Sequence, residues 1–277
     1  MAFVFRSRIC LSLGLLLAVV STAAGQAATQ PAPGDSFRAI VLQKGPLLLH
    51  LPGIGGYRGI DHRMLAGLRD AGVQGNFVVY DWTQQHPGII ALQSYQRNHQ
   101  EAQRVADLIT EHLEIDPTSP IYLTAHSGGC GIAVWALERL PPNVKVQTVL
   151  LMAPALSPKY DLSAALRHVN GKMYVFTSTL DSAILNFGTR IFGTIDGVQT
   201  IAAGFGGFVQ PAGADPLMYK KLVQRPYQKD WIRYGDYGEH IGAMSRPFAA
   251  AILAPLIGPL PIALPTTEPS DSQAAKY

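Results

Sequence analysis

Short apolar runs alternate with amphipathic stretches between residues 37 and 254. This alternation is typical of a parallel sheet flanked by helices, because a strand covered on both faces reads as a continuous apolar run. The expected strands span residues 38–43, 47–51, 77–80, 121–125, 148–152, 173–177 and 231–234. The expected helices span residues 61–71, 96–113 and 129–140. The pattern predicts an α/β fold with a mostly parallel central sheet and no large lid domain.

The N-terminal residues 1–27 have the pattern of an export signal. Arg6 and Arg8 precede an apolar run, and small residues follow it. The run is about 12 residues long, shorter than the roughly 20 that a membrane-spanning helix needs. We therefore expect cleavage near Gly25 or Ala27, a periplasmic or secreted product, and no membrane span in the mature chain. An uncleaved signal would act as an N-terminal anchor.

The remaining chain is divided by composition into three parts. We expect a linker over residues 28–36, a single folded domain over residues 37–254, and a tail over residues 255–277. Five prolines between Pro255 and Pro269 disfavour a helix or a central strand there, so the tail should be extended.

Composition and charge narrow the functional classes. Hydrophobic residues make up 48% of the chain and charged residues 15%, which indicates a compact body. The formal charge is +3 and the basic residues are scattered, so nucleic-acid binding gets no support. Cys10 belongs to the signal, which leaves Cys130 without a disulfide partner; we expect it to be a small buried side chain.

The stretch IYLTAHSGGCGIAVWALERL predicts a strand, a sharp turn and a helix, with Ser127 at the turn. Such a turn brings the residues two before and two after the serine together, so both must be small, as Ala125 and Gly129 are. A serine exposed in this way is suited to nucleophilic attack. The alternative is a glycine-rich helix N-terminus that only packs or binds an anion.

Through residues 125–129 (AHSGG), the earlier LLLHLPGIGG, and an Asp and a His in that order downstream, the chain resembles the α/β-hydrolase family over about residues 37–254. The resemblance implies a serine hydrolase with an oxyanion hole made by two backbone N–H groups. On this sequence those groups belong to Ile54 and Gly128. Pro52 replaces the histidine usual in the family, which leaves the first donor open between Ile54 and its glycine neighbours.

The general base must be a histidine on a loop beyond the last strand, and His240 in GDYGEHIGAM fits. His168 is the alternative, although its place near a helix end suits a favourable interaction with the helix dipole. His126 adjoins the serine, and its side chain should point away from Ser127. The others receive packing or surface roles: His50, His62, His86, His99 and His112.

The acid that orients the base should follow a strand between the serine and the histidine, as Asp181 does in KMYVFTSTLDSAIL. Asp181 could instead be a helix N-cap. Asp196 and Asp215 lie farther along the chain, and Asp236 is only four residues from His240.

The substrate class follows from the segment before His240. Its aromatic and aliphatic residues suggest an apolar acyl cleft, formed by Phe187, Ile191, Phe192, Phe205 and Phe208. Few residues separate the strands ending at residue 152 and beginning at residue 173, so we expect an open site. These features favour a small-molecule carboxylic ester with a short to medium acyl group. No motif for a cofactor or a metal is present.

Several other functions share these residues. Peptidase or amidase, thioesterase and acyltransferase chemistry all pass through the same acyl-enzyme, and an inactive binding module could keep the same fold. A dinucleotide-binding protein is disfavoured, because Arg58 stands where the third glycine of the fingerprint belongs. The sequence selects no oligomeric state.

Overall fold

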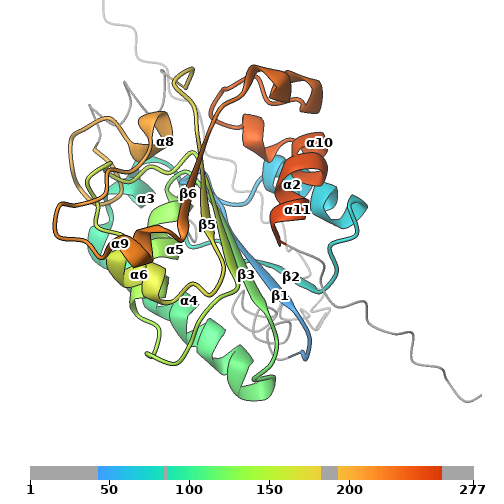
Figure 1. Ribbon diagram of the computed structural model, residues 1–277, viewed down its shortest axis with the longest axis vertical. Coiled ribbons are helices and arrows are strands. Elements are labelled where there is room, and N and C mark those ends of the chain that lie inside the picture. Colours follow the sequence, from blue (N-terminus) through green and yellow to red (C-terminus); the bar gives the residue numbers. More distant parts are fainter. Residues whose placement is uncertain (1–42, 84–85, 182–192, 258–277) are drawn as a thin grey trace, which may run out of the picture.

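The computed structural model describes residues 43–83, 86–181 and 193–257 (Figure 1). Its centre is a six-stranded sheet in the order β2-β1-β3-β4-β5-β6, in which every neighbouring pair is parallel. The strands are β1 (Leu47–Leu51), β2 (Asn76–Val79), β3 (Ile121–His126), β4 (Thr148–Met152), β5 (Met173–Thr177) and β6 (Leu222–Pro226). The predicted fold class is confirmed, and all strand carboxyl ends meet at one edge of the sheet.

Helices cover both faces of the sheet. In Figure 1, α4, α5, α6 and α9 lie on one face, and α2, α10 and α11 lie on the other. The α-helices are α2 (Gly59–Asp70), α3 (Ile89–Gln93), α4 (Tyr95–Ile115), α5 (Gly129–Glu138), α6 (Ser163–Arg167), α8 (Ala203–Gly206), α9 (Pro216–Tyr219), α10 (Arg246–Phe248) and α11 (Ala254–Ile257). Two 3₁₀ helices, η2 (Lys229–Tyr234) and η3 (Gly242–Met244), and a π-helical turn, η4 (Ala249–Leu253), complete the described elements.

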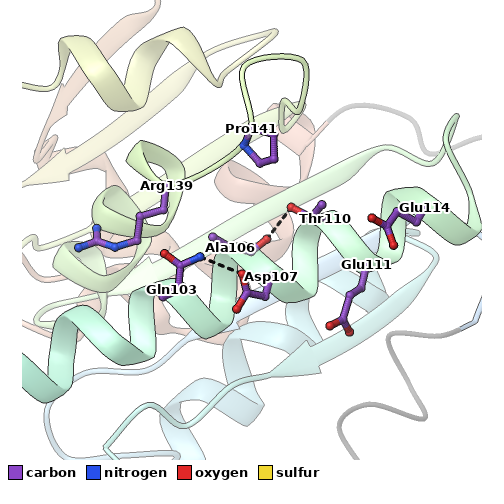
Figure 2. A pocket seen from close by; sticks show the side chains of 8 residues that line it. All are labelled: Gln103, Ala106, Asp107, Thr110, Glu111, Glu114, Arg139 and Pro141. Atoms are coloured by element: carbon purple, nitrogen blue, oxygen red, sulfur yellow. Dashed lines mark hydrogen bonds between the residues drawn. The ribbon is translucent and has the colours of Figure 1, made fainter.

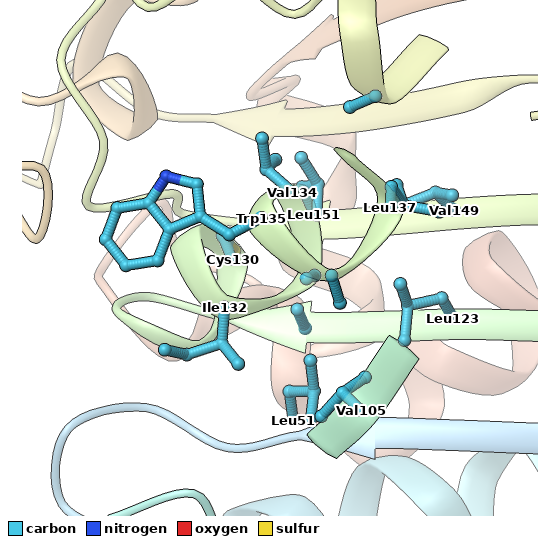
Figure 3. Close-up of a cluster of buried hydrophobic side chains, with 14 of the residues drawn as sticks. Leu51, Val105, Leu123, Cys130, Ile132, Val134, Trp135, Leu137, Val149 and Leu151 are labelled. Atoms are coloured by element: carbon cyan, nitrogen blue, oxygen red, sulfur yellow. The ribbon is translucent and has the colours of Figure 1, made fainter. Parts of the chain in front are cut away.

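The strand side chains divide the core into two clusters by simple alternation. Leu49 and Leu51 belong to the cluster that contains α4 and α5, whereas Leu48 belongs to the cluster that contains α2 and α10. Figure 3 shows α5 packed on the sheet, with Trp135 and Cys130 among the buried side chains. Every residue from Gly129 to Leu137 is buried, so this helix is held firmly at its N-terminal end beside Ser127.

One predicted strand is wrong. Residues 231–234 form part of the 3₁₀ helix η2, in which Trp231 packs against Phe176 and Phe248, with ring centroids 6.0 and 5.1 Å apart. The true last strand is β6, which the pattern missed because it is a partly exposed edge strand of mixed polarity ending in Pro226. Edge strands lack the continuous apolar run that identified the others.

The ends of the domain differ slightly from the prediction. The predicted strand at residues 38–43 falls almost wholly outside the described residues, as do the signal and linker. At the other end, the helix continues through Pro255 to Ile257, which is buried. The prediction therefore placed the start of the extended tail too early. The π-helical turn η4 ends two residues before Pro255, and a wider turn tolerates a residue that lacks an N–H donor. Along the described part of the chain, no helix is both long and apolar enough to cross a membrane.

Candidate active site

Ser127 stands on a sharp turn between β3 and α5, with a φ of 52°. The last residue of β4 and the loop after it hold this turn, because the Ser127 N–H donates to Met152 O at 2.9 Å and Ala155 N–H donates to Ser127 O at 3.1 Å. A Cβ on Gly129 would lie 2.3 Å from Pro52 O, so only glycine fits there. A left-handed conformation at a non-glycine residue is costly and persists where the surroundings fix it.

The structure brings Ser127, His240 and Asp181 together. His240 Nε2 lies 2.9 Å from Ser127 Oγ, and His240 Nδ1 lies 2.5 Å from Asp181 Oδ2. A carboxylate only accepts hydrogen bonds, so Nδ1 carries the proton and Nε2 can accept from the serine hydroxyl. Asp181 follows β5, and His240 lies on the loop between η2 and η3. Their side chains are 3% and 10% exposed, so the pair is shielded from water while the imidazole stays reachable.

The residues considered as alternatives to His240 and Asp181 make other contacts. His168 Nδ1 bonds Val144 O at 2.8 Å, and Asp196 accepts from both the N–H and the hydroxyl of Ser157. Asp215 caps α9 by accepting from Leu217 N–H. Asp236 is buried in the loop that carries His240, where it accepts from Gly238 N–H at 2.8 Å. Burial, together with nearby Glu239, raises the pKa of Asp236 to about 6.

The glycine loop after β1 lies against the serine turn. A Cβ on Gly53 would lie 3.3 Å from Ser127 Cβ, and a Cβ on Gly128 would lie 2.6 Å from Ile54 Cγ2. Within the described residues, no acceptor is recorded for the backbone N–H of Ile54 or of Gly128. The same is true of Gly53 and Gly55, so the choice of donor within this loop stays as open as the sequence left it.

The loop after β2 anchors this glycine loop, a role that the sequence analysis missed. Trp82 Nε1 donates to Pro52 O at 2.7 Å, and Gly88 N–H donates to Ile54 O at 2.6 Å. The Asp81 carboxylate accepts from Tyr57 N–H and also from Thr83 N–H and Oγ1. The one signal in the sequence was Asp-x-Thr at the end of a strand, a common turn pattern.

Two other expectations about side chains have clear outcomes. Phe208 is buried in the core, whereas Phe205 is half-buried and packs against the small cluster of Ala155 and Ala202. Phe187, Ile191 and Phe192 lie outside the described residues. Cys130 is buried as expected, and burial raises the pKa of its thiol well above the ordinary value.

His50 does more than the ordinary packing that was expected. It is fully buried, and its Nε2 lies 2.9 Å from Asp61 Oδ1 while its Nδ1 lies 2.9 Å from Thr124 Oγ1. His50, Asp61 and Thr124 lie on the α2 face of the sheet, and no contact between them and Ser127 is recorded.

A pocket of about 380 Å³ lies elsewhere on the molecule (Figure 2). It is lined by the C-terminal half of α4, including Asp107, Glu111 and Glu114, and by Arg139 and Pro141 after α5. These segments lead toward the amino ends of the strands, whereas Ser127 is at the carboxyl ends. No group of three or more His, Cys, Asp or Glu side chains that could hold a metal ion occurs among the described residues.

A parallel sheet in this order, a serine on a strand-to-helix turn, and a histidine and an aspartate from later loops together define an α/β-hydrolase fold. The fold establishes the architecture, whereas activity has to be argued from the site.

No family model matches the chain, and no curated protein matches it. Lipase B of Aspergillus fumigatus is similar in structure, at 15% identity and a TM-score of 0.48, over 76% of this chain and 51% of the lipase. The chain thus spans about half the length of that lipase. An acetylxylan esterase is similar at 15% identity and a TM-score of 0.45, over 77% of this chain and 99% of its own.

The NocB thioesterase domain, solved as a covalent complex with a fluorophosphonate nocardicin G analogue, is similar at 14% identity and a TM-score of 0.42, over 79% of this chain and 96% of its own. Likenesses this distant carry no argument about the activity of the present chain.

Proposed function

We propose that the protein is an exported serine hydrolase that cleaves carboxylic esters with short to medium acyl groups. One observation carries the proposal: Ser127 Oγ, the His240 ring and the Asp181 carboxylate form a continuous chain of hydrogen bonds of 2.9 and 2.5 Å at a strand-to-helix turn. This is the arrangement that lets a histidine remove the serine proton as the oxygen attacks a carbonyl carbon.

The residues have distinct roles in acylation. Ser127 Oγ forms a bond to the ester carbonyl carbon while His240 Nε2 takes the hydroxyl proton. Asp181 holds the ring by its Nδ1–H and stabilises the imidazolium. The tetrahedral oxyanion accepts hydrogen bonds from the N–H of Gly128 and of Ile54 or a neighbouring glycine, each worth roughly 3 kcal/mol of the barrier. The carbon–oxygen bond to the alcohol then breaks, and His240 returns its proton to the departing alkoxide.

Deacylation repeats these steps with water. His240 takes a proton from a water molecule that attacks the acyl carbon, and the ester bond to Ser127 Oγ breaks as the serine recovers its proton. The products are the carboxylic acid and the free enzyme. In both half-reactions only the neutral form of the His240 ring can accept the proton.

A fluorophosphonate probe tests the site assignment. It should label Ser127, and peptide mapping should find the label there and not on another serine. Ser127→Ala should abolish both labelling and turnover. Labelling at a different serine would overturn the assignment, and an unreactive protein with no esterase activity would indicate a binding module.

A substrate series tests the preference for esters. Nitrophenyl esters from acetate to palmitate should show kcat/KM rising with chain length and then levelling off, since each buried methylene contributes roughly 0.8 kcal/mol until the cleft is full. The motive is the apolar segment before His240 and the short connection between β4 and β5, which contains only the short helix α6. If matched amides were cleaved with the higher kcat/KM, the protein would be a peptidase or amidase.

Export is tested by the mass of the mature protein. The N-terminal pattern of Arg6 and Arg8 followed by an apolar run and small residues supports removal of the signal. The exported chain should begin near Gln26 or Ala28. A mass that retains Met1 or Ala2 would favour a membrane anchor.

A further inference from the structure

His126, the residue before the serine, contacts the backbone of the proposed base. Its Nε2 lies 3.0 Å from the carbonyl oxygen of His240, and the two rings have centroids 4.8 Å apart. We infer that His126 is a positioning residue that holds His240 in line with Ser127 through this hydrogen bond. The inference rests on the proposed function, because it assigns a role within the same site.

The loop that carries His240 has few other connections. Gly235 and Gly238, at φ values of 78° and 84°, give it freedom to turn. Its other recorded backbone hydrogen bonds close locally, such as Gly242 N–H to Glu239 O and Asp236 N–H to Trp231 O. Among the described residues, the bond from His126 is therefore the one recorded hydrogen bond that ties the backbone of residues 237–241 to a segment distant in the sequence. Besides it, the recorded hydrogen bonds of His240 in the described part of the chain are those of its ring with Asp181 and Ser127.

The chemistry of the bond fixes the tautomer of His126. A carbonyl only accepts, so Nε2 carries the proton and Nδ1 is the bare nitrogen. Nδ1 is buried and has no hydrogen-bond partner in the described part of the chain. A proton on Nδ1 would create an imidazolium without a counterpart.

The surroundings keep His126 neutral. Burial, and next the nearby His240 ring, lower the pKa of His126 to about 3, although the hydrogen bond to the His240 carbonyl and then the charge of Asp61 act in the opposite direction. Neutrality matters because His240 becomes an imidazolium during catalysis, and a second positive ring beside it would oppose that charge.

The His126 ring also fills the space between two loops of the site. A Cβ on Gly53 would lie 3.0 Å from His126 Nδ1 and 3.3 Å from Ser127 Cβ. The ring thus contacts the glycine loop on one side and the His240 loop on the other. A side chain that keeps the ring but lacks the donor should leave the packing in place and release His240.

Two substitutions separate the hydrogen bond from the packing. His126→Phe keeps a ring and removes the donor, and His126→Gln keeps an N–H donor at a similar reach. We expect His126→Phe to lower kcat for an ester roughly 10- to 100-fold with KM changed less than about twofold, because small displacements of a catalytic group are costly. His126→Gln should recover most of the loss.

His168 provides the matched control. It also bonds a backbone carbonyl, Val144 O at 2.8 Å, but lies away from the serine. His168→Phe removes the same kind of bond and should leave kcat unchanged. The deshielded NMR signal of the His240 Nδ1–H, which reports its bond to Asp181, should shift or broaden in His126→Phe and stay in place in His168→Phe.

Three outcomes would overturn the inference: a folded His126→Phe protein with the parent kcat, equal impairment of the Phe and Gln variants, or an unchanged His240 proton signal. If His126→Phe does not fold, His126→Gln is compared with His126→Asn. The Gln side chain can still reach the His240 carbonyl, whereas the shorter Asn side chain cannot, so only His126→Asn should lose kcat. Failure of the proposed function itself is recognised separately, because the parent would then hydrolyse no ester, or Ser127→Ala would keep the parent turnover. The proton signal would still report whether His126 holds His240.

Discussion

Two arrays of hydroxyl, imidazole and carboxylate meet at β3, three residues apart. They are the active-site array, Ser127–His240–Asp181, and the buried array, Thr124–His50–Asp61. Both have hydrogen-bond distances between 2.5 and 2.9 Å. Distances alone therefore do not distinguish the array that we propose to be catalytic from the other.

The backbone distinguishes them. Thr124 lies within β3, paired with His50 on β1 and Leu150 on β4, and is fully buried. Ser127 is past the end of the strand on a turn with a φ of 52°, next to backbone N–H groups with no recorded acceptor in the described residues. A nucleophile needs access and an oxyanion site as well as a base. The buried array has neither, although its side chains could perform the same proton transfer.

The buried array instead joins β1, β3 and α2. Asp61 lies in the first turn of α2, where its carboxylate also accepts from Arg58 N–H at 2.7 Å. Burial acts to raise the pKa of Asp61, but the hydrogen bond and charge of His50 and the Arg58 N–H outweigh it and lower that pKa. The array is thus a polar connection inside the core whose members satisfy one another.

The largest expected effect is on kcat, and it should distinguish the Ser127 hydroxyl from the Thr124 hydroxyl. Ser127→Ala should lower kcat by roughly 10⁶-fold, because losing a nucleophile removes the acyl-enzyme route. Thr124→Val, which keeps the shape of the side chain, should leave kcat within about tenfold of the parent because Thr124 touches no reacting atom. Steady-state hydrolysis of a nitrophenyl ester measures both. A comparable loss in Thr124→Val would show that the buried array takes part in catalysis.

The two carboxylates should respond in opposite ways. Asp181→Asn should lower kcat roughly 10⁴-fold while the protein stays folded, because the amide no longer selects the catalytic tautomer of His240. Asp61→Asn should lower the free energy of unfolding by about 3 kcal/mol or more, because it breaks a buried pair. The folded Asp61→Asn protein should keep the parent kcat. Denaturant unfolding and ester hydrolysis on the same samples measure both quantities.

Acid should weaken the buried array in a defined pH window. The pKa of Asp61 is lowered below the ordinary value of 3.8, so its contribution to stability is fully present above pH 3.8 and is lost as the pH falls through the folded-state pKa. The parent should therefore exceed Asp61→Asn in stability most strongly above that pH, with the difference shrinking below it. Unfolding curves recorded at several acid pH values measure the difference. A constant difference would contradict the assignment.

Asp236 provides a control, because its contribution to the free energy of unfolding should change with pH in the opposite direction to that of Asp61. Its pKa is raised to about 6, so the folded protein binds the extra proton and loses stability as the pH rises from about 4 to about 6. In Asp236→Asn the free energy of unfolding should therefore change less between about pH 4 and pH 6. The loss of stability at lower pH that we assign to Asp61 should remain.

The sequence predicted the parts of this molecule that depend on local chemistry. The strands from β1 to β5 are mostly apolar, and the turn at Ser127 is specified by the small residues on either side of it. Asp181 follows β5 as expected, and His240 reaches the same edge of the sheet although the segment before it is the 3₁₀ helix η2 and not the predicted strand. These residues could be chosen because each follows directly from a strand, a turn or a loop rich in glycine.

The missed features depend on contacts between distant segments. His50 is close to Asp61 because a strand and the following helix lie face to face, and no spacing in the chain marks Thr124 as their partner. The contact between His126 and the His240 carbonyl joins residues 114 positions apart. The aromatic residues at 231 and 234 favour a strand locally, but the segment forms a 3₁₀ helix in which Trp231 packs against Phe176 and Phe248.

The smallest expected effect compares backbone strain at the two hydroxyl positions. At φ 52° a Cβ costs roughly 1–2 kcal/mol, whereas the extra chain entropy of glycine costs about 0.5–1 kcal/mol. Ser127→Gly should therefore be more stable than Ser127→Ala by up to about 1.5 kcal/mol. In the extended β3 the order should reverse, with Thr124→Gly less stable than Thr124→Ala by about 0.5–1 kcal/mol. Ala153, the other described non-glycine residue with a positive φ, at 48°, should behave like Ser127, so Ala153→Gly should not destabilise the protein. Urea unfolding of the five variants measures these differences, and the same order at both hydroxyl positions would show that the serine turn stores no strain.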